Sequence, residues 1–374
     1  MIGKGQVFNR INAFIKYLIQ RSHSNREKVR LKSVFSFLYS ILKICDYYSS
    51  ANFYDFIQKY EGKGGNFDSV LANPEEIIIP LPKVEDRDIL NGHMPYGFQK
   101  EIKNKAPKFC LLFAPCGRGK TEAALLWAFE VCKKYQRNRI VFAMPTQVTS
   151  NAMYERFCVL FGTGEKKEER IKNGQKYVGL FHGKSFLKYG ESLKEEAVDY
   201  EDLTQEDLEE IKSENFKGNI FFKPITVTTI DHLILSFVHG FRQADFALGN
   251  LQNAVIIFDE IHYYEKTTLE HLVTLFKILK EMDIPHLLMS GTLPDFFIKK
   301  VREINPLYEG PIKDEEGLNF KPFRLLVYNT YLISEEKVNE EILEEIIKNY
   351  KSGFNQFIIV NTVRRSQELS LIHI

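Results

Sequence analysis

The sequence lacks long apolar runs and paired cysteines. No apolar stretch approaches the roughly 18 residues that a membrane-spanning helix needs, so we expect no membrane partner. The opening segment, MIGKGQVFNR, does not contain the continuous apolar core of a secretory signal, which makes the cytoplasm the expected location. The five cysteines are odd in number and are never spaced Cys-x-x-Cys, a pattern that argues against a disulfide framework and against a structural zinc site.

The sequence also lacks an excess of either charge. Lys and Arg number 50 and Asp and Glu number 49 among 374 residues, so the totals indicate neither a nucleic-acid nor a membrane partner. Hydrophobic residues make up 44% of the chain and charged residues 26%, which is typical of a folded soluble protein and too apolar for a disordered one. At roughly 150 residues per domain, the length predicts two or three domains.

The balanced total hides two segments of opposite charge. Residues 1–45 contain nine basic residues and one acidic residue, a net charge of +8, whereas residues 191–210 contain ten carboxylates against one lysine. In the basic segment, apolar residues recur at intervals of three and four, at Val7, Ile11, Phe14 and Leu18. This spacing predicts an amphipathic helix. We interpret both segments as solvated helical surfaces, with a nucleic-acid or partner contact and an acidic docking surface as the respective alternatives.

Short apolar runs separated by helical patterns dominate the sequence after Lys108. The runs lie at 109–114, 139–143, 176–181, 225–229, 254–258 and 286–289, and helical patterns lie at 120–134, 147–160, 231–239 and 266–282. This alternation is typical of an α/β domain whose parallel sheet is covered by helices on both faces. We place this domain at residues 91–305, with a polar insertion at about 162–220, after a helical region and connector at 1–90. A further β/α unit at 306–374 has too few elements to close a domain.

The strongest chemical signal is a glycine-rich loop between a predicted strand and a predicted helix. It reads Ala114-Pro115-Cys116-Gly117-Arg118-Gly119-Lys120-Thr121. In that setting such a loop forms a nest of backbone N–H groups for a β-phosphate, reinforced by the positive end of the helix dipole. Lys120 is predicted to neutralise β- and γ-phosphate oxygens, and the Thr121 hydroxyl to ligate Mg²⁺. We therefore assign Cys116 to Thr121 to phosphate binding.

Two adjacent carboxylates follow the apolar run 254–258. A carboxylate at the carboxyl end of a parallel strand points into the crevice where ligands bind. We expect Asp259 to hold Mg²⁺ and Glu260 to polarise an attacking water as a general base. His262 completes the tetrapeptide DEIH and is included among the catalytic candidates. The alternative is that the two acids only cap a helix. The phosphate-binding loop upstream favours the catalytic interpretation over this alternative.

Three further residues are expected to serve the nucleotide. Ser290 and Thr292 flank a glycine after the last apolar run, where we expect them to couple the state of the γ-phosphate to a polymer track; an ordinary cap is the alternative. Gln99 precedes the first run and is placed to read an adenine through paired amide hydrogen bonds, with Tyr96 or Phe98 stacking on the base. The alternative is a surface glutamine ahead of a helix.

Hydroxyl and amide side chains at two strand ends indicate a polymer track. Thr146 and Asn151 follow one apolar run, and Thr228 and Thr229 end another. Hydroxyls and helix N-terminal amides suit backbone phosphates without reading bases, so these four residues are candidate nucleic-acid contacts. Each strand end also fits a plain N-cap. His182 ends a further run and is a candidate contact to nucleic acid or a partner, with a satisfied structural histidine as the alternative.

Six segments that carry these residues stand in a fixed order: FQ, APCGRGKT, MPTQ, TVTT, DEIH and SGTLP. In this order they resemble the first motor domain of superfamily 2 helicases. The chain is more closely similar to the helicase portion of the CRISPR-associated type I interference helicase–nuclease family. That closer resemblance rests on APCGRGKTEAAL, HGK, TTIDHL, FDEIHYYE and SGTLP, and it covers about residues 90–374.

The resemblance implies a RecA-like P-loop domain followed by the start of a second RecA-like domain. It implies an ATP-dependent translocase that moves 3′ to 5′ on single-stranded DNA, with ATP and Mg²⁺ as cofactors. It also implies recruitment by an RNA-guided surveillance complex of CRISPR antiviral interference. On the matching motifs, ATP hydrolysis falls to Lys120, Thr121, Asp259 and Glu260, and adenine recognition falls to Gln99.

The sequence departs from the family pattern in several places. Ala114 replaces the first glycine of the general loop. Residues 1–90 lack the His and Asp cluster of the HD nuclease domain that members often carry, which leaves a nuclease on a separate polypeptide or a helicase-only variant. The arginine finger and other late motifs of the second motor domain are missing, so we expect the chain to bind ATP but to hydrolyse it poorly. The ending LSLIHI resembles a translated sequencing adapter, and we expect the native frame to continue beyond Glu368.

Two other classes of function stay open from the sequence. A DExH RNA helicase or a restriction-type translocase would share the same motor motifs. A non-catalytic nucleic-acid-binding scaffold, with nucleotide only as a switch, would share the phosphate-binding loop without turnover.

Overall fold

The computed structural model describes residues 24–50, 79–193, 205–238, 240, 244–261, 266–293, 295–319, 332–334, 337–353 and 362–370. The chain divides into two compact units, Met1–Asn319 and Phe320–Ile374, and each unit is described by itself. Within the described ranges, no helix is long and apolar enough to cross a membrane.

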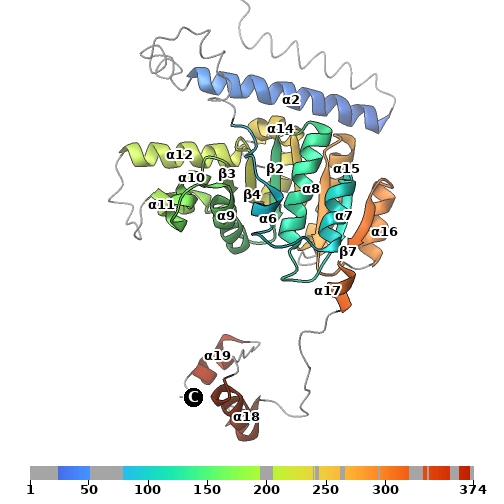
Figure 1. Cartoon of the computed structure of the whole chain (residues 1–374). Helices are drawn as coiled ribbons and strands as arrows, with labels where there is room; N and C mark the ends of the chain where they lie inside the picture. The colour runs from blue at the N-terminus through green and yellow to red at the C-terminus, as the bar shows by residue number, and fades with distance from the viewer. Residues whose placement is uncertain are drawn as a thin grey trace, which may run out of the picture. The chain divides into compact units, whose positions relative to one another are not determined.

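Unit 1, drawn in Figure 1, is built on a seven-stranded sheet. Its strand order is β3-β4-β2-β5-β6-β1-β7, with parallel pairing throughout. The strands are β1 (Phe109–Phe113), β2 (Arg139–Met144), β3 (Val178–Phe181), β4 (Ile225–Thr229), β5 (Ala254–Phe258), β6 (His286–Ser290) and β7 (Glu309–Lys313). Every residue of β1 to β6 is buried, which is why these strands read as continuous apolar runs. The predicted α/β class with a parallel sheet is confirmed.

Helices cover the two faces of this sheet and enclose two apolar cores. Successive strand side chains point to opposite faces, so Cys110 and Leu112 of β1 join one core, whereas Leu111 and Phe113 join the other. The first core includes residues of α7, α8 and α9, and the second includes residues of α13, α14, α15 and α16. The helices of unit 1 are α2 (Asn25–Ser50), α6 (Asp86–Ile89), α7 (Gly97–Lys105), α8 (Lys120–Tyr135), α9 (Gln147–Phe161), α10 (Lys167–Gly174), α11 (Ser185–Leu193), α12 (Gln205–Asn219), α13 (Ile230–Phe237), α14 (Ala244–Gln252), α15 (Lys266–Glu281), α16 (Asp295–Ile304) and α17 (Glu315–Asn319).

Helix α2, in the region where the sequence predicts helical structure, packs on α14 through a serine. The Ser40 hydroxyl donates to the Phe246 carbonyl at 2.7 Å, and the Gly249 N–H donates to Ser40 Oγ at 3.0 Å. A Cβ on Gly249 would lie 2.5 Å from Ser40 Oγ, so a larger residue would push the two helices apart. The amphipathic helix predicted around Val7 to Leu18 lies outside the described residues.

A buried lysine anchors part of the predicted insertion beside the sheet. Lys223 is 2% exposed, and its ammonium donates to the Gln175 carbonyl at 2.5 Å and pairs with Glu214 of α12. Burial lowers the pKa of Lys223, and the charge of Glu214 opposes that shift. Residues 194–204, which include part of the acidic stretch, lie outside the described residues.

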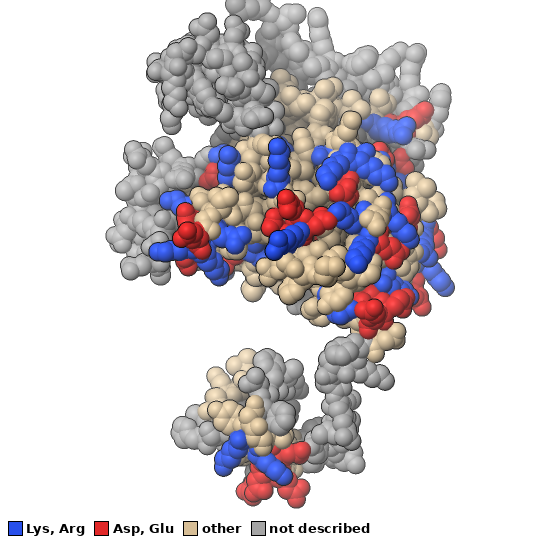
Figure 2. All heavy atoms as spheres, in the orientation of Figure 1, with Lys and Arg blue, Asp and Glu red and all other residues tan. Residues whose placement is uncertain are grey.

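Charged side chains of both signs are interspersed on the face of unit 1 drawn in Figure 2. Two ion pairs are formed by lysines of α7: Lys103 pairs with Asp86, and Lys105 Nζ lies 2.7 Å from Glu101 Oε1. Exposed pairs of this kind contribute at most about 1 kcal/mol each. The near-equal totals of basic and acidic residues are thus reflected locally on this face.

The described residues of unit 2 form a short antiparallel ribbon and two helices. They are β8 (Ile333–Ser334), β9 (Lys337–Val338), α18 (Glu340–Lys351) and α19 (Val363–Ser370). The start of unit 2 at Phe320 differs from the domain boundary expected after residue 305. The difference arises because β7 pairs with β1, which brings residues 309–313 into the sheet of unit 1.

Candidate active site

The glycine-rich loop joins β1 to α8 in a conformation that requires glycine. Gly117 and Gly119 have φ angles of +77° and +75°, and Lys120 is the first residue of α8. Positive φ is open to glycine and strained for most other residues. The first turn of a helix has N–H groups without intrahelical partners, and its dipole favours an anion there. The local backbone therefore has the form that a phosphate-binding loop needs.

The two strongest motifs meet in one ion pair. Lys120 Nζ lies 2.6 Å from Glu260 Oε1, although the two residues are 140 positions apart in the sequence. The Lys120 side chain is 8% exposed and that of Glu260 24%, so water screens their attraction only in part. Glu260 has a φ of +48°, a strained value that recurs at functional sites. The structure thus brings together the residues expected to bind a phosphate and to activate a water.

Asp259 directly follows β5, next to the Lys120–Glu260 pair, and its carboxylate is largely shielded from water. The residue is 7% exposed, and Asp259 Oδ1 accepts the Glu260 N–H at 2.9 Å. Burial and the charge of Glu260 raise the pKa of Asp259 to about 6, against the opposing charge of Lys120. A cation would favour the ionised carboxylate.

The donor set of the site fits Mg²⁺ in its usual protein environment. The carboxylate of Asp259 and the hydroxyl of Thr121 are hard oxygen ligands, and Mg²⁺ commonly binds through one or two such groups together with substrate phosphates. No group of three His, Cys, Asp or Glu suited to a metal occurs among the described residues, and a site completed by phosphates needs none. His262 lies outside the part of the chain that the structure describes.

The Ser290–Thr292 segment lies against the phosphate-binding loop. The Ala114 N–H donates to the Ser290 carbonyl at 3.3 Å, and a Cβ on Gly291 would lie 3.9 Å from Lys120 Nζ. The Ser290 hydroxyl donates to the Thr292 carbonyl at 2.7 Å, and Ser290 Oγ accepts the Thr292 N–H at 3.3 Å. The segment is therefore close enough to respond to a ligand on Lys120, as the predicted coupling role requires.

Gln99 supports the phosphate-binding loop, a role that the sequence did not reveal. Its Nε2 donates to the Gly119 carbonyl at 3.0 Å, and its Oε1 accepts the Tyr96 N–H at 2.8 Å. Each bond uses one of the two hydrogen-bonding positions of that atom, so one N–H and one lone pair of the amide remain. Gln99 is only 2% exposed, which rules out the alternative of a surface glutamine. Phe98 is 3% exposed and Tyr96 40%, but the Tyr96 ring is already stacked with Phe98, with ring centres 6.1 Å apart, and lies against the Arg118 guanidinium.

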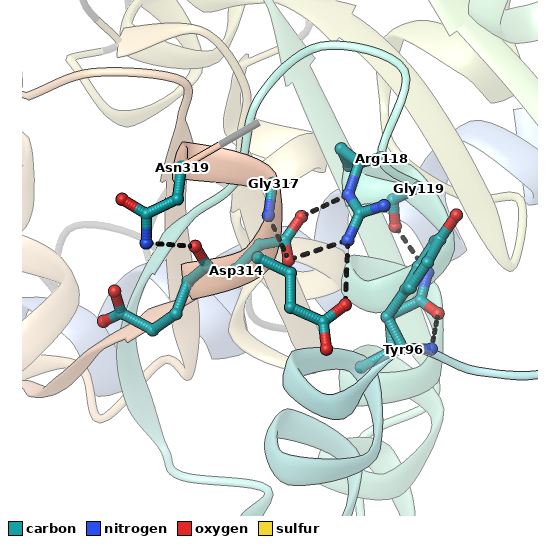
Figure 3. Close-up of polar contacts among 9 residues, drawn as sticks. Tyr96, Arg118, Gly119, Asp314, Gly317 and Asn319 are labelled. Atoms are coloured by element: carbon teal, nitrogen blue, oxygen red, sulfur yellow. Dashed lines mark hydrogen bonds and ion pairs between the residues drawn. The ribbon is translucent and has the colours of Figure 1, made fainter. Parts of the chain in front are cut away.

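Arg118 directs its side chain to Asp314 instead of across the loop (Figure 3). Arg118 Nε lies 2.6 Å from Asp314 Oδ2 and Nη2 lies 3.1 Å from Oδ1, a bidentate arrangement. The guanidinium carbon also lies 4.0 Å from the ring centre of Tyr96. The hydrogen bond from Arg118 lowers the pKa of Asp314, whose side chain is only 4% exposed. In this structure the Arg118 side chain is therefore held by Asp314, and its backbone belongs to the glycine-rich loop.

Asp314 is a residue of this site that the sequence analysis missed. It follows the edge strand β7, and its N–H donates to the Phe113 carbonyl at the end of β1 at 2.9 Å. This contact spans 201 sequence positions, and no motif surrounds Asp314. Only the pairing of β7 with β1 brings it to the loop.

The Arg118–Asp314 pair should be energetically coupled. Because Asp314 is buried, we expect a double-mutant cycle of Arg118→Ala and Asp314→Ala to give a coupling of about 1–3 kcal/mol in the free energy of unfolding, measured by denaturant titration. The exposed pair Lys105–Glu101 is the matched control and should couple by less than about 0.5 kcal/mol. Additive effects at Arg118 and Asp314 would contradict the importance of this pair.

The four candidate nucleic-acid residues are not equally accessible. The Thr146 hydroxyl caps α9 by accepting the Thr149 N–H at 3.2 Å, and Asn151 is half-buried on the second turn of that helix. Thr229 is 4% exposed, with Oγ1 2.8 Å from His232 Nδ1. Thr228 is fully buried and donates to the Phe181 carbonyl of β3 at 2.9 Å. The expected contact of Thr228 with nucleic acid therefore disagrees with the structure, because the Thr228 hydroxyl faces the neighbouring β-strand β3.

Comparisons with known proteins bear on this site. A family model for DEAD/DEAH box helicases matches residues 96–301. A CRISPR-associated nuclease/helicase of Methanocaldococcus jannaschii is 55% identical over 354 residues, which cover 93% of this chain and 45% of that protein. The CRISPR-associated nuclease/helicase Cas3 of Streptococcus thermophilus is 28% identical, with 81% of this chain and 35% of that protein covered. A crystal structure of T. fusca Cas3–AMPPNP is 22% identical and has a TM-score of 0.46, with 61% of this chain and 24% of that chain covered. The chain thus spans less than half the length of these relatives.

Proposed function

The chain belongs to the DEAD/DEAH box helicase family, and we propose that it is the ATP-driven motor portion of a CRISPR interference helicase that moves along single-stranded DNA. The observation that carries this proposal is the 2.6 Å contact between Lys120 and Glu260. It joins a phosphate-binding loop and a candidate general base in one site, and a buried carboxylate lies beside them. The similarity to the Methanocaldococcus jannaschii and Streptococcus thermophilus proteins supports the link to CRISPR interference.

In this proposal each residue of the site has a distinct task. Lys120 neutralises β- and γ-phosphate oxygens of ATP, and the loop N–H groups orient the β-phosphate. Thr121 and Asp259 would hold Mg²⁺, which supplies positive charge against the phosphate oxygens. Glu260 accepts a proton from the attacking water. Gln99 uses its remaining amide positions for adenine, and Ser290 and Thr292 respond to the γ-phosphate.

The proposed polymer track lies at the carboxyl ends of β2 and β4, where α9 and α13 begin. Thr146 and Asn151 are half-buried there, whereas Thr229 is 4% exposed and its hydroxyl contacts His232. The proposed partners are single-stranded DNA, an RNA-guided surveillance complex and an HD nuclease on a separate polypeptide. The proposed location is the cytoplasm.

ATP hydrolysis by the chain with single-stranded DNA, and with RNA of the same sequence, tests the proposal. Because we expect this chain to hydrolyse ATP poorly, DNA should raise the low rate of hydrolysis only modestly, and RNA should leave it unchanged. Equal stimulation by RNA would favour an RNA helicase. Binding of DNA and ATP with a hydrolysis rate that neither nucleic acid changes would favour a nucleotide-switched scaffold.

A further inference from the structure

A buried histidine lies directly behind the candidate strand-binding residue Asn151. His182 follows β3 and is 3% exposed. Its Nε2 lies 2.8 Å from Asn151 Oδ1, and its Nδ1 lies 3.1 Å from the Lys184 nitrogen. The histidine therefore touches α9 on one side and its own loop on the other.

These two contacts determine the tautomer of His182. The Lys184 N–H can only donate, so His182 Nδ1 must be the unprotonated acceptor. The proton of the neutral ring is then on Nε2, which donates to Asn151. Burial, together with the charge of His232, lowers the pKa of His182 to about 4, so the neutral ring persists at neutral pH. The ring thus presents a single fixed donor to Asn151.

The fixed donor in turn determines the orientation of the Asn151 amide. Only Oδ1 of Asn151 can accept from His182, so the amide NH₂ group faces away from the histidine. A phosphodiester has acceptor oxygens and no donors, and an amide turned the other way would oppose it with a second acceptor. The orientation imposed by His182 is therefore the one that suits a nucleic-acid backbone.

Neighbouring residues form a converging surface at the carboxyl ends of β2, β3 and β4. Gln147 lies one helical turn before Asn151, on the same face of α9. A Cβ on Gly183 would lie 3.5 Å from Gln147 Nε2 and 4.0 Å from His232 Cε1. Gly183 and Lys184 are exposed, so backbone without a side chain and one positive charge lie beside the amide. This setting can admit a strand of phosphates at close range.

We propose that His182 is a positioning residue that locks Asn151 with its NH₂ group toward the bound strand, so that Asn151 donates to a backbone phosphate. This inference rests on the proposed function, because it assumes that a nucleic-acid strand crosses this surface. His182 would act through the Asn151 side chain and would not itself contact the nucleic-acid strand.

The nearly isosteric replacement Asn151→Asp separates the two roles that Asn151 could have. Aspartate still accepts from His182, but it presents a negative oxygen where the amide presented a donor. We expect fluorescence anisotropy with a labelled oligo-dT strand, at fixed salt, to show a loss of affinity of more than about tenfold for Asn151→Asp and of about tenfold for Asn151→Ala. Asn91→Asp makes the same charge change at an exposed position whose left-handed backbone aspartate tolerates, and it should bind like the parent chain.

A double variant tests whether His182 acts through Asn151. We expect His182→Ala to weaken strand binding in the parent chain and to have no further effect in the Asn151→Ala background. NMR titration of the His182 ring in Asn151→Asp reports the contact independently of the strand, because a carboxylate at Nε2 should raise its pKa from about 4.

The outcomes distinguish this inference from the proposed function. If the parent chain binds the strand and Asn151→Asp binds equally well, or if the effects of His182→Ala and Asn151→Ala add, the positioning role is overturned while the proposed function stands. If the parent chain does not bind the strand, the proposed function fails and the positioning role fails with it.

Discussion

Replacing Lys120 by alanine should weaken ATP binding about a hundredfold or more, because in the proposed site the ammonium would make charge-assisted hydrogen bonds to phosphate. In the structure Lys120 is nearly buried and faces Glu260, with Asp259 also close by. Without the lysine, two carboxylates line the site with no cation between them, and an incoming triphosphate meets like charge. Equilibrium binding of a fluorescent ATP analogue measures the effect.

A matched control for this prediction lies on the same helix. Lys133 belongs to α8, but its side chain is 72% exposed and pairs with Glu130 at the surface. Lys133→Ala should leave nucleotide affinity unchanged. Affinity of Lys120→Ala within about twofold of the parent value would show that the loop does not hold the phosphates in the way proposed, since a twofold change is only about 0.4 kcal/mol.

Replacing Glu260 by glutamine should separate nucleotide binding from nucleotide hydrolysis. The amide has nearly the same shape but cannot accept the proton of the attacking water, and loss of a general base typically costs about 10²–10⁴ in rate. Glutamine also pairs less strongly with Lys120, so phosphate should compete for the lysine at least as well as in the parent chain. Single-turnover hydrolysis of labelled ATP and a binding isotherm measure the two properties separately.

The expected pattern for Glu260→Gln is slow turnover with retained affinity for ATP and for single-stranded DNA. Glu270→Gln makes the same change at an exposed position of α15 and should hydrolyse ATP at the parent rate. Hydrolysis by Glu260→Gln near the parent rate would remove Glu260 from the chemistry. In a scaffold, Glu260→Gln would leave the nucleic-acid function intact, whereas in a motor it would abolish translocation.

The sequence predicts the central sheet well because burial on both faces leaves a strong signal. Each of β1 to β6 is continuously buried and appears as an apolar run. The edge strand β7 reads Glu309-Gly310-Pro311-Ile312-Lys313, with one fully buried residue. An edge strand with one partner needs no apolar run, so its place beside β1 could not be inferred from pattern alone.

The candidate site is predictable where its residues belong to a motif that directly follows an apolar strand, and not where a residue without a motif is brought in by an edge strand. The loop at 114–121 and the acids at 259–260 follow strands directly, so their position at the sheet edge follows from topology. The partnership of Arg118 with Asp314 depends on the register of an edge strand. The sequence predicts a contact of Thr228 with nucleic acid, but the residue is buried. A hydroxyl at the end of a β-strand can face solvent or the neighbouring β-strand, and the sequence does not distinguish the two orientations.

The link from Arg118 to Asp314 has a mechanical consequence. Asp314 also holds α17, since its side chain accepts the Gly317 N–H at 3.1 Å and its carbonyl accepts the Leu318 N–H at 2.9 Å. A displacement of α17 therefore breaks hydrogen bonds to Asp314, the residue whose carboxylate pairs with Arg118 of the glycine-rich loop.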